Sequence, residues 1–106
     1  MIICTAESVA GYRTVETLGL VQGSCIKSKH LGKDIGAGLK SLVGGELRGY
    51  SELLEESRQE AISRMIEQAD RLGADAIIAM RFGSSQVMSG AAEFVAYGTA
   101  VKLLKA

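Results

Sequence analysis

The feature that most constrains this chain is a long amphipathic pattern between Ser51 and Leu72. Its apolar residues recur at the spacing that places them on one face of a helix. These apolar residues are Leu53, Leu54, Ala61, Ile62, Met65, Ile66, Ala69 and Leu72. The opposite side is polar and holds Glu55, Gln59, Glu60, Arg64, Glu67 and Arg71. The pattern therefore predicts one long helix, with Ser51 as its N-cap and Gly73 directly after its end.

A second pattern, in the N-terminal third, is typical of strands. Residues 1–5 suit a short first strand, and β-favouring residues alternate from Arg13 to Ile26. Gly19 and Gly23 interrupt this alternation. Because glycine inside a strand usually marks a bulge or a close approach of two backbones, we expect one of these at each position.

The C-terminal third has the pattern of a hairpin. Ala76 to Phe82 predicts a buried strand, residues 83–90 a polar connection, and Ala92 to Leu104 a further strand. Strands at both ends around a helical middle predict an α+β fold with an antiparallel sheet of about four strands. A chain of 106 residues suits a single domain over residues 1–106.

Between the first strands and the long helix, the apolar spacing favours a short helix. Ile35, Leu39, Leu42 and Val43 fall on one face of such a helix. Asp34 is well placed as its N-cap, and the Gly44-Gly45 pair is expected to end it. The glycine pair then serves as a hinge that reverses the chain before Ser51.

The charge balance and the apolar content exclude some classes of partner. The chain has 12 Lys plus Arg and 12 Asp plus Glu, so no net field attracts nucleic acid or an anionic membrane. Its apolar runs are much shorter than the roughly 20 residues that span a bilayer. We expect a cytoplasmic protein with free thiols, since no export signal is evident. The hydrophobic fraction of 47% is high for a small chain and suggests a subunit interface.

Catalytic motifs are weak in this sequence. The segment Gly36 to Ser41 lacks the third glycine of the dinucleotide fingerprint and does not match a phosphate-binding P-loop. Cys25 and His30 could form a nucleophile and base pair, but no orienting third group can be identified. We therefore assign no catalytic residue and regard enzymatic activity as the least favoured function.

Three residues are candidate metal ligands. Cys4, Cys25 and His30 carry soft or borderline donors that suit a soft divalent ion or Cu(I). A structural zinc site usually has four ligands in short paired motifs, and none occurs here. The alternative is that each buried cysteine acts as a small hydrophobe. In an oligomer, however, symmetry can bring one such ligand from each subunit to a shared axis.

A set of residues spread over nearly the whole chain resembles the YbjQ-like family of small bacterial proteins. The set comprises Asp34, Gly38, Val43-Gly44-Gly45, Tyr50, Ala61, Ala69, Leu72-Gly73-Ala74-Asp75-Ala76 and Gly98-Thr99-Ala100-Val101. The resemblance implies a dodecin-subunit-like α+β subunit that assembles into a ring-shaped homopentamer. It also brings a heavy-metal-binding label, but it assigns no metal ligand to any position. If a small ligand binds, we expect it at the loops that contain Asp34, Gly44, Gly45 and Tyr50.

Two functional hypotheses follow. The first is an oligomeric binding module that takes up a soft metal ion or a small ligand at subunit junctions, with Cys4, Cys25 and His30 as candidate ligands. The alternative is a structural or partner-binding ring without metal or small-molecule chemistry. Replacement of both cysteines by serine distinguishes them, since only the first predicts a loss of metal affinity.

Overall fold

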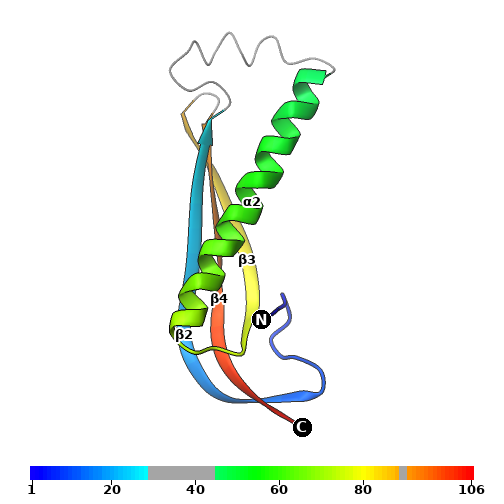
Figure 1. Cartoon of the computed structure of the whole chain (residues 1–106), viewed down its shortest axis with the longest axis vertical. Helices are drawn as coiled ribbons and strands as arrows, with labels where there is room; N and C mark the ends of the chain where they lie inside the picture. Colours follow the sequence, from blue (N-terminus) through cyan, green and yellow to red (C-terminus); the bar gives the residue numbers. More distant parts are fainter. Residues whose placement is uncertain (29–44, 89–90) are drawn as a thin grey trace.

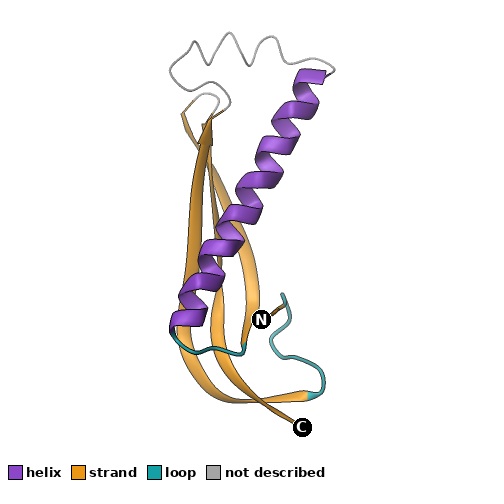
Figure 2. Cartoon of the chain, in the orientation of Figure 1, coloured by secondary structure: helices purple, strands orange, loops and turns teal. Residues whose placement is uncertain are grey.

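The computed structural model describes residues 1–28, 45–88 and 91–106, which form four strands and one helix (Figures 1 and 2). The strands are β1 (Ile2–Ile3), β2 (Tyr12–Ser28), β3 (Ala76–Met88) and β4 (Ala91–Lys105). The helix is α2 (Gly45–Arg71). This arrangement confirms the predicted α+β class and the number of strands.

The four strands form one sheet in the order β1-β3-β4-β2. Both β2 and β3 pair with β4 in antiparallel register, whereas β1 pairs with β3 in parallel register. The sheet is therefore mixed, and the expectation of an antiparallel sheet was wrong at β1. A parallel pair requires a long crossover connection, and here β2 and α2 lie between the two strands in the sequence.

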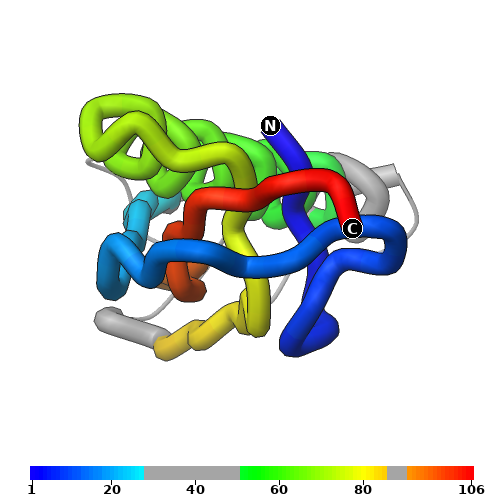
Figure 3. The backbone as a smooth tube through the Cα atoms, turned by 90° about the horizontal axis from the view of Figure 1, so that it is seen from below, coloured from blue at the N-terminus to red at the C-terminus, as the bar shows by residue number. Residues whose placement is uncertain are grey.

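The helix lies on one face of the sheet, so the molecule has two layers (Figure 3). Between the layers is a core of small and medium-sized side chains. The residues of this core are Val21, Cys25, Ala61, Met65, Ala69, Ile77, Met80, Ala96 and Ala100. Ala61 and Ala69 lie four residues on either side of Met65, and their small side chains let the helix backbone approach the sheet closely.

Gly19 and Gly23 have the two roles expected for glycine inside a strand. Gly19 has a φ of +119° and lies at a register shift between β2 and β4. Gly23 faces α2, where an added Cβ would lie 2.7 Å from the Cβ of Arg64 and even closer to the backbone of Ala61 and Met65. The first glycine therefore allows a bulge, and the second allows the helix to contact the strand.

Gly73 ends α2 as predicted. It has a φ of +75°, and its N–H donates to the carbonyl of Asp70 at 3.0 Å. The N–H of Ala74 donates to the carbonyl of Ala69, also at 3.0 Å. These two bonds make a Schellman motif, which satisfies carbonyl groups that the end of a helix leaves free. Asp75 then accepts a 2.8 Å hydrogen bond from the N–H of Leu103 and connects the turn to β4.

The start of α2 differs from the prediction. The helix begins at Gly45, so Ser51 lies inside it rather than at its N-cap, and the proposed hinge does not include Gly45. Gly49 is also helical, because its cost of about 1 kcal/mol relative to alanine is too small to stop a helix flanked by good helix formers. The short helix expected from Asp34 lies outside the described residues. Within the residues that the structure describes, no helix combines the length and the apolar content needed to span a bilayer.

The expected polar connection after Phe82 is mostly strand. β3 continues to Met88, and its polar residues Ser84 and Ser85 pair with Phe94 and Glu93 of β4. Main-chain hydrogen bonds hold such a ladder together whatever the polarity of its side chains. The connection between β3 and β4 is therefore shorter than predicted.

Candidate functional site

The two candidate thiol ligands lie at opposite edges of the sheet. Cys4 follows β1, and its N–H donates to the carbonyl of Ile77 in β3 at 3.0 Å. Cys25 belongs to β2, which is the other edge strand of the described sheet. With β3 and β4 between the edges, the backbones that carry the two thiols are about 14 Å apart across the sheet, which is too far for one ion to bind both sulfurs within one chain.

The remaining candidate residues do not join either thiol in the described structure. His30, Asp34 and Gly44 lie outside the described residues. Gly45 and Tyr50 lie in the N-terminal part of α2 and are therefore helical rather than part of a loop.

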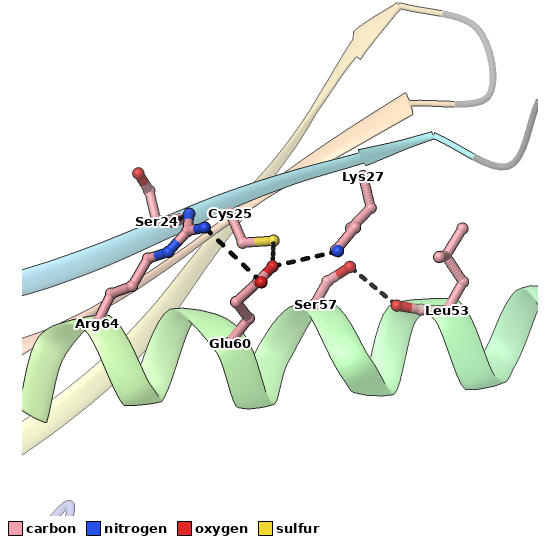
Figure 4. A network of polar contacts seen from close by, with 7 residues as sticks. All are labelled: Ser24, Cys25, Lys27, Leu53, Ser57, Glu60 and Arg64. Carbon is pink, nitrogen blue, oxygen red and sulfur yellow. Dashed lines mark hydrogen bonds and ion pairs between the residues drawn. The ribbon is translucent and has the colours of Figure 1, made fainter. Parts of the chain in front are cut away.

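Cys25 is the centre of a group of polar side chains between β2 and α2, which we term the Cys25 cluster (Figure 4). It consists of Cys25 and Lys27 from β2 and Glu60 and Arg64 from α2. The thiol of Cys25 donates to Glu60 Oε2 at 2.6 Å, and Lys27 Nζ lies 3.3 Å from the same oxygen. Arg64 lies 3.7 Å from Glu60 Oε1 and also donates to the carbonyl of Ser24. Glu60 therefore contacts one thiol and two cations.

Local geometry explains why these four side chains meet. Residues two apart on a strand share a face, which places Cys25 and Lys27 together. Residues four apart on a helix also share a face, which places Glu60 beside Arg64. Ser57 is fully buried nearby, but its hydroxyl donates to the carbonyl of Leu53 at 2.8 Å within the helix.

The electrostatics of the cluster keep the thiol protonated. Burial raises the pKa of the Cys25 thiol, and the hydrogen bond to the Glu60 carboxylate raises this pKa further. The pKa of Glu60 is lowered, first by the hydrogen bond from Cys25 and then by Lys27. At neutral pH the pair is therefore a thiol that donates to a carboxylate, and a metal must displace the proton before it can bind the sulfur.

As a metal site, the Cys25 cluster is incomplete within this part of the chain. It offers one sulfur and one carboxylate oxygen, whereas a tetrahedral site needs four ligands. Among the described residues, no group of three or more His, Cys, Asp or Glu could hold a metal ion. Lys27 and Arg64 also repel a cation near Glu60. The cluster therefore does not fit a heavy-metal ion unless further donors come from elsewhere.

Cys4 lies in a different environment. It is half-buried, and its sulfur lies 3.6 Å from the carbonyl of Ala6. The segment around Cys4 is bonded to an irregular part of β3, where Ala79 has a φ of +53° and donates to Ala6 at 2.8 Å. Arg81 donates to the carbonyl of Thr5 at 2.9 Å. Cys4 is thus the less buried thiol, and no carboxylate of the described residues is hydrogen-bonded to it.

Sequence reasoning found Cys25 but missed its partners Lys27, Glu60 and Arg64 as parts of a site. The spacing of Glu60 and Arg64 indicated a pair on the polar face of a helix. It could not show which residues of β2 that face would contact.

Comparison with known proteins gives consistent results along the whole chain. A family model described as "Putative heavy-metal-binding" matches residues 1–104. A UPF0145 protein from Fervidobacterium nodosum is 62% identical over 105 residues, which cover 99% of this chain and 97% of the relative. A UPF0145 protein from Methanosarcina acetivorans is 57% identical over 104 residues and covers 98% of both chains. Because the second relative is archaeal, the expected restriction to bacteria was too narrow.

One solved structure shares the fold. It is the crystal structure of a protein of unknown function in the DUF74 family from Pediococcus pentosaceus. The TM-score is 0.63, and the match covers 98% of both chains at 19% identity. At this identity, the likeness shows a common fold alone.

Proposed function

Because the chain belongs to the YbjQ-like family, which includes the UPF0145 proteins, we propose that it is a small homo-oligomeric binding module. In this proposal, a soft heavy-metal ion or a small ligand binds where subunits meet. The observation that carries the proposal is an apolar sheet face that α2 does not cover.

We term this surface the bare sheet face and define it by Leu20, Ile26 and Tyr97. Leu20 and Ile26 alternate with the helix-facing residues of β2 and are 68% and 61% exposed. Tyr97 of β4 is 39% exposed and is aligned with Gln22, which lies between them on the same face. Gln22 and Ser24 separate Leu20 from Ile26 on this face, but exposed apolar side chains that share one sheet face favour burial against another protein surface. A second copy of the chain is the simplest occupant, in agreement with the high hydrophobic fraction of 47%.

The edges of the sheet support a ring. Among the described strands, β2 pairs only with β4. On the other side of the sheet, the segment around Cys4 is bonded to β3 as far as Met80, and beyond Met80 β3 pairs only with β4. The two free edges differ, so they can join head to tail, and such contacts close into a ring when the rotation permits. The radius of gyration of 17.2 Å exceeds the roughly 13 Å of a compact domain of this length, which also favours assembly. The family resemblance favours five subunits.

A head-to-tail junction would have one thiol on each side, Cys4 from one subunit and Cys25 from the next. Cys25 pairs with Phe94 of β4, which in turn pairs with Ser84 of β3. Cys4 is hydrogen-bonded to Ile77, seven residues earlier in β3, so the two thiols lie at different heights along the strands. The two thiols can bind one ion only if neighbouring sheets are staggered along the strand direction. His30 follows β2 in the sequence and is the third candidate ligand at this junction.

The second candidate function is a structural or partner-binding ring without metal chemistry. The specific observation in its favour is the charge of the Cys25 cluster, where Lys27 and Arg64 flank the one carboxylate. Those cations oppose a metal ion, and the raised pKa of Cys25 opposes formation of the thiolate that would bind it.

Native mass spectrometry of the reduced protein tests the proposal, with and without Zn(II), Cd(II) and Cu(I). We expect a mass of about 56 kDa, as for five 11.2 kDa subunits, with stoichiometric metal. The Cys4→Ser and Cys25→Ser variants should keep this mass and lose metal. A ring that binds no metal would support the second function, and a monomer would contradict both.

A further inference from the structure

The sulfur of Cys25 contacts the carboxylate of Glu60, a side chain that is itself partly exposed to solvent. Cys25 is 2% exposed, whereas the side chains of Glu60, Lys27 and Arg64 are 38%, 36% and 52% exposed. The buried thiol therefore donates to a partly exposed carboxylate, which is in turn paired with two partly exposed cations. Ion pairs between exposed side chains are weak, each worth up to about 1 kcal/mol, so these side chains can move without unfolding the protein.

The contact between Cys25 and Glu60 leaves no room for another atom. At 2.6 Å from Glu60 Oε2, the sulfur cannot bond a further group on that side until the carboxylate moves away. The backbone beneath is fixed, because Gly23 holds β2 against Ala61 and Met65 of α2. The side chains of the cluster must therefore move before this sulfur can react.

We propose that the Cys25 cluster is a gate that controls access to the Cys25 thiol. In the closed state, Glu60 covers the sulfur and is held there by Lys27 and Arg64. In the open state, Glu60 leaves the sulfur, and a thiol-seeking reagent or ion can reach it. Cys4 is less buried, its sulfur is hydrogen-bonded only to backbone carbonyls among the described residues, and it reacts without this opening step.

Cys25 is also a candidate metal ligand in the proposed function, but the gate does not require that the protein bind a metal. Its test uses 5,5′-dithiobis(2-nitrobenzoate), a disulfide that reacts with one thiol at a time. The Cys25 thiolate attacks one sulfur of the reagent, the reagent S–S bond breaks, and thionitrobenzoate leaves with the electron pair. The thiol proton passes to water. A failure of the gate can therefore be distinguished from a failure to bind metal.

The first measurement compares the two thiols in the folded protein. The Cys4→Ser variant reports on Cys25, and the Cys25→Ser variant reports on Cys4. Each rate is divided by the thiolate fraction, measured from its ultraviolet absorbance, to remove the effect of the pKa. We expect Cys25 to react at least about tenfold more slowly than Cys4, because only the open fraction is reactive. Equal corrected rates would overturn the proposal.

The second measurement removes the gate in the Cys4→Ser background. Glu60→Gln loses both ion pairs and should raise the corrected rate at Cys25 several-fold. Lys27→Met and Arg64→Met each remove one ion pair with Glu60 and should raise the corrected rate less. Glu56→Gln is the matched control, since Glu56 is exposed on the same helix. The proposal is wrong if Glu60→Gln reacts at the rate of Glu56→Gln.

A third measurement distinguishes gate opening from unfolding of the whole chain. The rate at Cys25 is followed in urea concentrations below the unfolding transition. Movement of side chains exposes little surface, so we expect the rate to depend weakly on urea. A rate that rises with the full urea dependence of global unfolding would show that Cys25 reacts only in the unfolded chain, and the gate would be excluded.

Discussion

Two parts of the contact between α2 and β2 differ in chemistry. In one part, Val21 and Gly23 pack against Ala61, Met65 and Ala69, all of which are buried and apolar apart from the glycine backbone. In the other part, the Cys25 cluster connects the same two elements through ion pairs and a thiol. The apolar part determines how closely the helix approaches the strand. The polar part determines whether the one buried thiol of that interface is accessible.

The two parts should contribute differently to stability and to function. Burial in close-packed apolar contacts accounts for most folding energy, whereas exposed ion pairs contribute little. Substitutions in the apolar part should therefore change stability strongly. Substitutions in the cluster should change the pH dependence and the reactivity of Cys25 more than the overall stability.

The largest effect is expected for Gly23→Ala. The new Cβ would meet the backbone of Ala61 and Met65, which cannot move aside as a flexible side chain could. We expect the free energy of unfolding to fall by about 3 kcal/mol. Urea unfolding measures this, and Gly83→Ala is the matched control, because no atom lies within 4 Å of its added Cβ. A Gly23→Ala protein as stable as the control would contradict the close contact.

A pair of truncations in α2, one buried and one half-buried, gives the next largest effect. Met65 is fully buried in the apolar part, whereas Leu53 of α2 is half-buried beyond the cluster. We expect Met65→Ala to lower the free energy of unfolding by about 2 to 4 kcal/mol and Leu53→Ala by about 1 kcal/mol. Thermal or urea unfolding of both variants checks the order. Equal losses would mean that the two parts of the interface are packed alike.

The change in stability at alkaline pH should depend on the ionisation of Cys25. Its folded pKa is raised above the ordinary thiol value, so its contribution to stability is complete below that value and declines as pH rises through the folded pKa. In the Cys4→Ser background, stability should therefore fall above about pH 8.5. The Cys4→Ser, Cys25→Ser double variant should lack the loss of stability that ionisation of Cys25 causes. Parallel pH profiles for the two proteins would show that Cys25 is not held as a thiol.

The smallest effect is expected for Glu60 at acidic pH. Its folded pKa is lowered, so the stability it adds is present above about pH 4.3 and is lost as pH falls through the folded pKa. The difference in stability between wild type and Glu60→Gln should therefore shrink at acidic pH. Glu67→Gln, exposed on the same helix, is the control. A difference that does not change with pH would argue against the contact with Lys27.

Much of the fold could be predicted because single residues have strong local preferences. Gly73 indicated the end of α2, and Gly19 and Gly23 indicated irregularities in β2, since few other residues tolerate those positions. The start of α2 could not be predicted in the same way. Gly49 and Ser51 favour a helix boundary only weakly, and the surrounding helix formers outweigh them. The parallel pairing of β1 also depends on contacts between residues far apart in the sequence.

The candidate site was less predictable than the fold. The thiol of Cys25 can be recognised in the sequence, but its contact with Glu60 depends on the position of α2 along β2. That position depends on the close packing of Gly23 against Ala61 and Met65. Periodicity assigns each residue to a face of its own helix or strand, and it does not determine which positions of two elements meet.

The central claim, that a second copy covers the apolar surface left bare by α2, is tested most directly by sedimentation velocity. The reduced wild-type protein and the Leu20→Lys variant are compared at the same concentrations. We expect the wild type to sediment as an assembly of about five 11.2 kDa subunits and the variant to dissociate, because a lysine would be buried in the interface. A wild-type monomer, or a variant that assembles as well as the wild type, would contradict the account.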